Sequence, residues 1–177
     1  MSEGWLSIRV ELVEGRGEHL WPRPGRIFAA SPLHTFADLA DAIDDGFARW
    51  DRSHLREFTL AYGSRLAMLD DEDDGLEGED MGVVTLARLR PGEQFTYVFD
   101  LGDEWAHLCR VQDELLDVDE TWDVEADLPL PYFGWGAIPD QYDRRWAEDE
   151  GDGDVPADPG LSDLPPLLPG WGPEADD

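Results

Sequence analysis

The sequence predicts an α+β fold: a mostly antiparallel sheet around a central β-hairpin, with one main packed helix and a few short helices. Three observations predict this class. Apolar and polar residues alternate with the period of a strand at residues 5–14, and again on both sides of a turn at 94–111. Apolar residues recur at helical spacing at 35–47. With 41% hydrophobic residues and eight tryptophans, the chain can bury one core, so we expect a single domain at 1–147.

The central hairpin is expected at about residues 94–111, and its register depends on the length of the turn. A two-residue turn at Gly102-Asp103 would mix core and surface residues on each face. A three-residue loop at 102–104 would keep one face apolar by pairing Phe99 with His107. The other pairs would then be Leu101 with Trp105, Tyr97 with Cys109 and Phe95 with Val111. A buried face fixes the register, so we predict the three-residue loop, with His107 on the apolar face.

Three further strands and turns are expected around this hairpin. The first strand covers residues 5–14, where Leu, Ile, Val and Leu alternate with polar residues. The chain returns in a second strand at 19–30, but Pro22 and Pro24 cannot donate to a ladder. They should push the first half of this strand to a sheet edge or a bulge. A third strand is expected at 55–62.

The helices are expected at three places. Thr35 is a suitable N-cap for the main helix at about 35–47. Its inward side chains would be Phe36, Leu39, Ala40, Ile43 and Phe47. Thr85 should cap a short helical turn, and Pro139 suits the first turn of a last helix. Between these two, the proline- and aromatic-rich stretch 129–135 is expected to be irregular but packed.

The charge is extreme and unevenly distributed. Thirteen arginines and no lysine face 42 acidic residues, for a net charge of −29. Eight of the acids lie in residues 70–80 and ten in 148–177, and neither segment contains a base. We therefore expect a mobile acidic loop at 70–82 and a disordered, Pro- and Gly-rich acidic tail at 148–177. The tail includes an apolar island at 164–171, which suits either a linear docking motif or a return onto the domain.

This charge limits the partners that the protein can bind. It repels DNA phosphates and anionic lipid surfaces, so direct DNA binding and membrane binding are not expected. It attracts basic partners, and a basic protein is the partner we expect. Solubility, a coding bias toward arginine, or growth in high salt would explain the same composition. Cys109 has no disulfide partner, and the chain lacks a leader-like segment or a long apolar run, so we expect a cytoplasmic protein.

The residues that could form a site cluster at the hairpin and before the third strand. The candidate binding residues are His54, Asp100, Asp103, Trp105 and His107. Imidazole and carboxylate groups suit zinc, nickel or manganese, which would make a metal-dependent hydrolase or nucleic-acid-processing enzyme. The alternative is that His107 is a core histidine and that the two aspartates serve the turn. Because no phosphate-binding or nucleophile motif is present, we predict no catalytic residues, no metal and no cofactor.

Three strings of residues resemble a known family. They are Ser53-His54-Leu55-Arg56-Glu57-Phe58, Val84-Thr85-Leu86-Ala87, and the hairpin string from Phe95 to His107 with its D-x-G-D-x-W-x-H pattern. Together with Trp21-Pro22-Arg23 and the helix at 35–47, they resemble the plasmid open-reading-frame-three-like family, whose members are also labelled passenger TnpR proteins of insertion elements. The likeness covers roughly residues 5 to 115. It implies an α+β fold with a mostly antiparallel sheet, and it implies no particular activity.

The chain also departs from the family pattern. Many relatives have a second histidine where Arg56 stands, and a cysteine-containing segment after the hairpin, where this chain reads 128–135 without cysteine. A metal site built on those groups is therefore not expected here. The function predicted from the sequence is a non-enzymatic interaction module of a mobile-element-associated family, which binds a basic protein through acidic surfaces. The alternative is the metal-dependent enzyme centred on His54, Asp100, Asp103 and His107.

Overall fold

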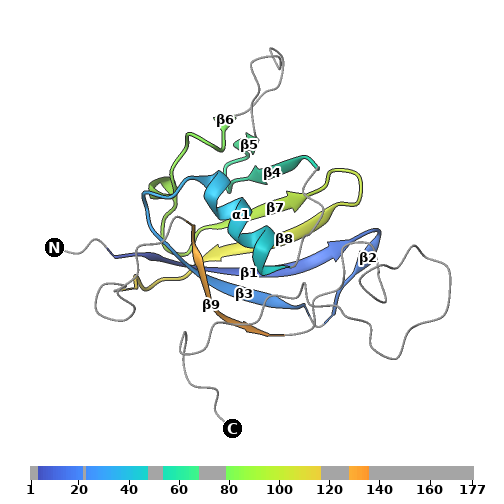
Figure 1. The fold of residues 1–177 in the computed structure, drawn as a ribbon, viewed down its shortest axis with the longest axis horizontal. Helices are drawn as coiled ribbons and strands as arrows, with labels where there is room; N and C mark the ends of the chain where they lie inside the picture. The colour runs from blue at the N-terminus through green and yellow to red at the C-terminus, as the bar shows by residue number, and fades with distance from the viewer. Residues whose placement is uncertain (1–3, 22, 48–53, 68–78, 117–127, 136–177) are drawn as a thin grey trace, which may run out of the picture.

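The computed structural model describes residues 4–21, 23–47, 54–67, 79–116 and 128–135. These residues form one nine-stranded sheet, with a single α-helix and a single 3-10 turn. The predicted α+β class is therefore wrong, because the described fold is mostly β (Figure 1). Of the predicted short helices, the one after Thr85 is only the 3-10 turn Leu86–Arg88, and the one at Pro139 lies outside the described residues.

The sheet has one continuous path of neighbouring strands. Its strands are β1 (Leu6–Gly15), β2 (Glu18–His19), β3 (Gly25–Ala30), β4 (Arg56–Thr59), β5 (Arg65–Ala67), β6 (Glu79–Asp80), β7 (Gln94–Phe99), β8 (Trp105–Val111) and β9 (Leu130–Trp135). They follow the order β6-β5-β4-β7-β8-β1-β3-β9, and β2 pairs with β1. All pairs are antiparallel except β5 with β6, which is parallel. The central hairpin, β7–β8, therefore lies in the middle of the sheet.

Strand β1 forms because of its alternating pattern, as predicted. Its apolar members, Leu6, Ile8, Val10 and Leu12, are all buried. The predicted second strand is divided into β2 and β3, and the segment between them contains Pro24. The carbonyl of Pro24 still accepts a hydrogen bond from the amide of Leu12, at 2.9 Å. The edge effect expected from proline thus interrupts the strand and leaves its second half paired with β1.

Helix α1 (Phe36–Gly46) lies across one face of the sheet (Figure 1). It begins with a capping box, in which the Thr35 hydroxyl accepts from the Asp38 amide and the Asp38 carboxylate accepts from the Thr35 amide. All five side chains predicted to face inward are buried. Within the described residues, no helix has the length and apolar character that a membrane span requires.

The register of the central hairpin differs from the prediction by two residues. Phe99 pairs with Trp105, and Tyr97 with His107. The loop is therefore five residues long, 100–104, rather than three. The shift is an even number of residues, so the predicted apolar face is kept from Phe95 to Phe99 and His107 is buried on it, whereas Leu101 falls in the loop and is exposed. The longer loop is closed by hydrogen bonds within it and by the left-handed backbone conformation of Asp100 and Glu104.

The remaining strands lie at the two ends of the sheet. The predicted third strand is reduced to β4, after which the chain turns at 60–64 into β5. The stretch 129–135, which we expected to be irregular, contains β9 at the opposite edge. Of the predicted acidic loop, residues 70–78 lie outside the described residues, whereas Glu79–Asp80 form β6 and Met81 is fully buried. The tail at 148–177 also lies outside the described residues.

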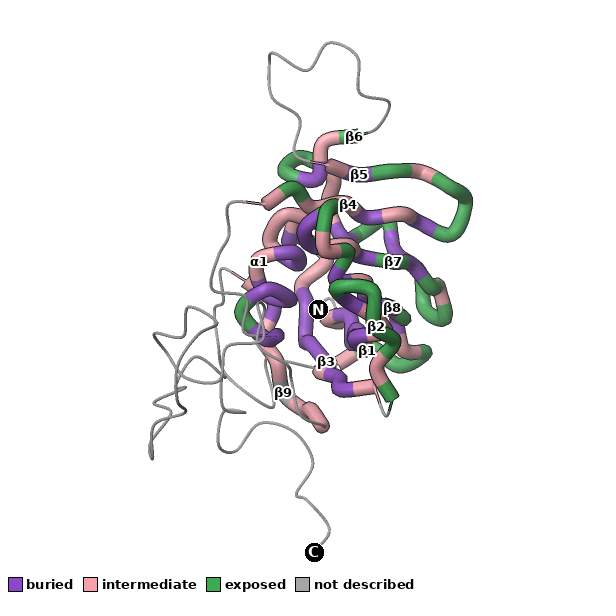
Figure 2. The backbone as a smooth tube through the Cα atoms, turned by 90° about the vertical axis from the view of Figure 1, so that its right-hand side faces the viewer, coloured by how far each residue is buried: buried purple, intermediate pink, exposed green. Residues whose placement is uncertain are grey.

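One core fills the space between α1 and the sheet. Figure 2 shows buried positions along β1, β3 and the helix turns that face them. Aromatic rings from three elements meet at its centre, where Phe36 of α1 packs edge-on against Phe58 of β4, with ring centroids 5.2 Å apart. Tyr97 of β7 packs against Phe58 at 4.7 Å. The core therefore holds the central hairpin rigidly, and the loop 100–104 extends from that rigid base.

Candidate functional site at the hairpin corner

The loop 100–104 is closed by the side chain and main chain of Asp100. Its Oδ1 accepts hydrogen bonds from the amides of Gly102, at 3.0 Å, and Asp103, at 3.2 Å. Its carbonyl accepts from the amide of Glu104, at 2.7 Å. Asp100 and Glu104 both have positive φ angles, 64° and 54°, a conformation that L-residues rarely adopt. Asp100 tolerates it because its short carboxylate can hydrogen-bond locally.

A second turn is attached to this loop. The amide of Arg16 donates to the carbonyl of Asp103, at 2.7 Å, and its guanidinium lies 3.8 Å from the Asp103 carboxylate. Arg16 also has a positive φ, 54°. Among the described residues, Arg16, Asp100 and Glu104 are the only non-glycine residues with positive φ, so all the strained backbone gathers here. Strain of this kind is concentrated at functional sites more often than elsewhere.

His54 completes the arrangement, and we call His54, Arg16 and residues 100–105 the hairpin corner. Nδ1 of His54 lies 3.4 Å from Oδ2 of Asp100, and its ring packs edge-on against Phe99. The amide of Asp100 donates to the carbonyl of Leu55, at 2.9 Å, which fixes the chain beside His54. The His54 side chain is about a quarter exposed, whereas that of Asp100 is nearly buried. The carboxylate thus orients an accessible imidazole.

Trp105 forms the floor of the hairpin corner. It is 2% exposed, and its ring lies directly over Gly15 of β1. A Cβ atom at Gly15 would be 2.0 Å from the ring, so only glycine leaves room for the indole. Trp105, one of the predicted site residues, therefore supports the loop by packing against β1.

His107, the fifth predicted site residue, lies elsewhere. It is 1% exposed and points into the core, where Nδ1 is 3.0 Å from the carbonyl of Tyr97. Its ring contacts Phe47, the C-cap residue of α1, with centroids 5.0 Å apart, and Tyr97, at 5.2 Å. The structure thus brings His54, Asp100, Asp103 and Trp105 to one corner and places His107 in the core beneath α1.

This arrangement limits the chemistry that the corner can perform. Among the described residues, no three histidine, cysteine or acidic side chains come close enough together to hold a metal ion. His54 and Asp100 alone provide two ligand-type groups, fewer than a structural or catalytic zinc site uses. What the corner offers is an oriented imidazole at the surface, suited to a hydrogen bond or an ionic contact with a partner.

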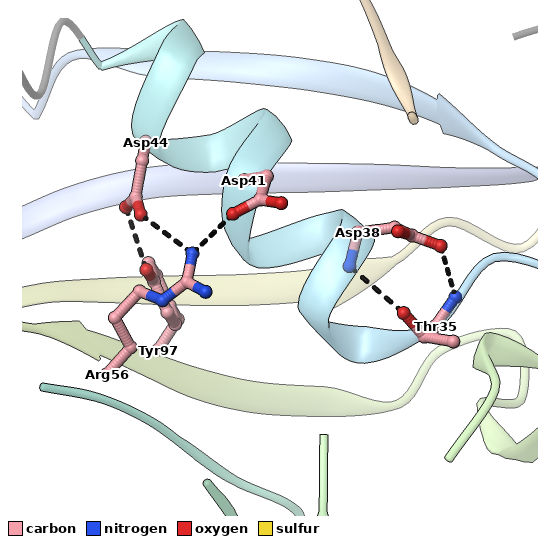
Figure 3. Close-up of polar contacts among 6 residues, drawn as sticks. All are labelled: Thr35, Asp38, Asp41, Asp44, Arg56 and Tyr97. Atoms are coloured by element: carbon pink, nitrogen blue, oxygen red, sulfur yellow. Dashed lines mark hydrogen bonds and ion pairs between the residues drawn. The ribbon is translucent and has the colours of Figure 1, made fainter. Parts of the chain in front are cut away.

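Sequence reasoning missed a buried polar network beside this corner. Arg56 of β4 donates to Asp41, at 2.6 Å, and to the fully buried Asp44, at 3.2 Å (Figure 3). The hydroxyl of Tyr97 donates to the other oxygen of Asp44, at 2.7 Å. The signal was present in the sequence, because Asp44 follows Phe36 and Ala40 at intervals of four and falls on the apolar side of the helix.

Nearby negative groups compensate for the partial burial of the Arg56 guanidinium. Burial lowers the pKa of Arg56, but the hydrogen bond to Asp41 and the nearby Tyr97 and Asp44 outweigh that effect and raise the pKa above its ordinary value. The guanidinium is therefore always charged, and it balances a carboxylate that would otherwise be buried alone. The network joins α1, β4 and β7, and the segment that carries His54 leads directly into it.

The fold and site define a mostly antiparallel β-sheet domain with one helix across a face and a polar corner on its central hairpin. The chain belongs to the plasmid pRiA4b ORF-3-like protein family, whose model matches residues 7–134. The sequence prediction of this family is confirmed. Among solved structures, the chain is similar to the protein of unknown function MM3350 from Methanosarcina mazei Go1.

This similarity is 21% in sequence identity, with a TM-score of 0.60, over 76% of this chain and 71% of the other. At that identity it concerns the fold alone. No curated protein matches the chain significantly.

Proposed function

We propose that this protein is a non-enzymatic interaction module that binds a basic protein partner through acidic surfaces. The observation that carries the proposal is the distribution of charge. The described residues hold 16 of the 42 acids and nine of the 13 arginines, which gives them −7 of the −29. The remaining −22 belongs to the rest of the sequence, chiefly 70–78 and 148–177. A moderately acidic body with strongly acidic segments suits electrostatic capture of a cationic surface.

The geometry of the hairpin corner supports a binding role over a catalytic one. Its loop is closed by its own hydrogen bonds, and the carboxylate of Asp100 orients its imidazole. A surface of this kind presents a fixed contact to a partner.

We also propose that the chain is one of the family members labelled passenger TnpR proteins of insertion elements, and that it acts in the cytoplasm. The family membership supports the first point. The second is supported by Cys109, which is buried and has no disulfide, as suits a reducing compartment. A gene lying between the terminal repeats of an insertion element would agree with the first point, and a gene distant from any transposase would contradict it.

The test of binding uses an oligo-arginine peptide as the probe, titrated against the full chain at low and high salt. Three variants each convert six acids to amides. One changes the segment acids Asp70, Asp71, Glu72, Asp73, Asp74 and Glu77. The second changes the tail acids Glu148, Asp149, Glu150, Asp152, Asp154 and Asp158. The control changes the solvent-accessible body acids Glu14, Glu18, Asp45, Glu79, Asp113 and Glu114, which lie outside the hairpin corner.

Binding should weaken steeply with salt, and the segment or tail variant should lose more affinity than the control, although all three change the net charge equally. Equal losses in the three variants would mean that only net charge acts, which contradicts the proposal. An affinity that salt leaves unchanged would contradict it as well. A pull-down from host extract should enrich proteins of high isoelectric point, and enrichment of none would count against a basic partner.

A further inference from the structure

A cleft of about 680 Å³ lies at the opposite end of the hairpin from the corner, where β7 begins. One wall is the β4–β5 turn, 60–64, and the other is the segment 88–94 that leads into β7. The volume is within the range of about 300–1,000 Å³ that is typical of small-molecule sites. Nothing in the proposed binding of a basic protein uses this cleft.

Hydrogen bonds of the main chain fix both walls before any ligand arrives. In the first wall, the amide of Leu60 donates to the carbonyl of Ser64, at 2.8 Å, and Gly63 adopts a φ of 82° that glycine alone takes without strain. In the second, the amide of Gly92 donates to the carbonyl of Val111, at 2.8 Å, and Gly92 has a φ of 83°. A cleft with fixed walls loses little entropy on binding.

The charged groups of this cleft are mostly basic, in a chain with a large excess of acid. Arg88 and Arg90 both line it. Arg90 makes no ion pair with any residue in the described part of the chain. Arg88 is paired with Glu79, but both side chains are about half exposed, and such a pair is weak enough for a ligand to displace. The one acid in the lining, Glu93, is engaged by the amide of Arg90, at 3.0 Å.

A further arginine lies beyond the cleft. Gln94, which lines it, is the direct partner of Arg110 across the β7–β8 pair, so their side chains lie on the same face. Arg110 is exposed and also lacks an ion pair with any described residue. Its other neighbour, on β1, is Arg9, a like charge. Arg9 is paired with Glu11, at 3.1 Å, whereas Arg110 has no such partner among the described residues and remains available to an anion.

The cleft also contains an aromatic residue, Tyr62, so it can recognise a ring in a ligand as well as its charge. Tyr62 lines the cleft and is 95% exposed, and Ser64 of the same turn also lines it. An exposed aromatic ring can stack on a flat ring, while Arg90, which lines the same cleft and makes no ion pair with any described residue, can bind an attached anion. From the cleft, Arg90 and Tyr62 together, we propose that this is a binding site for a nucleoside monophosphate.

The test is calorimetric titration of the full chain with adenosine monophosphate, uridine monophosphate, inorganic phosphate and adenosine at low salt. A monophosphate should bind saturably and more tightly than phosphate or adenosine alone. Arg90→Gln should weaken it about tenfold or more, because a charge-assisted hydrogen bond is lost. Tyr62→Ala should weaken the nucleotides and leave inorganic phosphate unchanged. Arg65→Gln is the matched control, an exposed arginine outside the cleft lining, and should have no effect.

Three outcomes would overturn the proposal: no saturable nucleotide binding, inorganic phosphate bound as tightly as the nucleotides, or equal losses in the Arg90 and Arg65 variants. Amide chemical shifts provide an independent measurement. Adenosine monophosphate should perturb residues 60–64 and 88–94, and shifts confined to other residues would place any binding elsewhere and reject this site. The substituted side chains are exposed, so unchanged thermal unfolding is expected for each variant.

Discussion

The hydroxyl of Tyr97 donates a 2.7 Å hydrogen bond to Oδ1 of Asp44, and both side chains are fully buried. This bond joins the middle of the central hairpin to the last turn of α1. A carboxylate in such a place is costly unless it is paired and hydrogen-bonded, and Arg56 supplies the charge that Tyr97 cannot. The three residues thus position the helix on the sheet, and through β4 they position the segment that carries His54.

Of the substitutions in this network, Arg56→Gln should lower the free energy of unfolding the most. It leaves Asp44 with a neutral partner only, and breaking a buried ion pair costs about 3–5 kcal/mol. Tyr97→Phe should cost less, about 1.5–3 kcal/mol, because it removes one hydrogen bond to a charged group. Urea unfolding measures both. The control is Arg65→Gln, which breaks an exposed 3.5 Å pair with Glu57 and should cost less than about 1 kcal/mol. Equal effects for the two arginines would show that the network contributes nothing.

Gly15→Ala should destabilise the hairpin corner by about 1–3 kcal/mol, because the new Cβ would meet the Trp105 ring. The cause can be isolated with a double-mutant cycle. Replacing Trp105 by Leu should remove most of the penalty of Gly15→Ala, which gives a coupling energy of about 1 kcal/mol or more. Gly17→Ala is the comparison, since Gly17 has a φ of 79° and open space around it. Its cost should be unchanged by Trp105→Leu, and coupling there would argue against a steric origin.

Much of the local structure could be predicted from the sequence, because local rules determine it. The Thr35 cap, the inward face of α1 and the alternation of β1 depend on spacing alone, and all are observed. The buried face of the hairpin was also predicted correctly. Its register was not, because we placed Leu101 on the buried face opposite Trp105, whereas the structure leaves Leu101 exposed in a loop with positive φ angles at Asp100 and Glu104. A left-handed conformation at two acidic residues leaves no pattern in the sequence.

The errors in fold class have a different origin. Prolines at 129 and 131 argued against a strand, yet β9 forms at the edge of the sheet, where a missing amide is tolerated. The contact of His54 with Asp100 depends on the pairing of β4 with β7, which joins distant parts of the chain. Proximity in sequence suggested that His107 belonged to the same site, but strand alternation alone had already placed it on the core side.

Substitutions at Asp100 should separate its two roles in the loop. Asp100→Ala loses the acceptor for two amides and must keep a positive φ of 64°, so we expect a loss of about 1–3 kcal/mol in unfolding free energy. Asp100→Asn keeps an acceptor and tolerates the left-handed conformation, so it should lose less. Asp100→Gly removes only the acceptor and should fall between the two. If Ala and Asn destabilise equally in urea, the side-chain hydrogen bonds do not close the loop.

Cys109 should make the stability depend on pH in the alkaline range. Burial raises the pKa of its thiol well above the ordinary value, so the folded protein keeps the proton after the unfolded chain has released it. Below the unfolded pKa, near about 8.5, both states are protonated and the contribution is complete. Above it, stability should fall by up to about 1.4 kcal/mol per pH unit, because the unfolded state binds fewer protons. Urea unfolding at about pH 8 and about pH 10 measures this fall. The control is Cys109→Ala, which has no thiol to ionise at this position, so its stability should fall less between the same two pH values. The comparison also separates the effect of the thiol from that of tyrosines, which ionise in the same pH range. An identical fall in the two proteins would mean that the thiol ionises as readily in the core as in the unfolded chain.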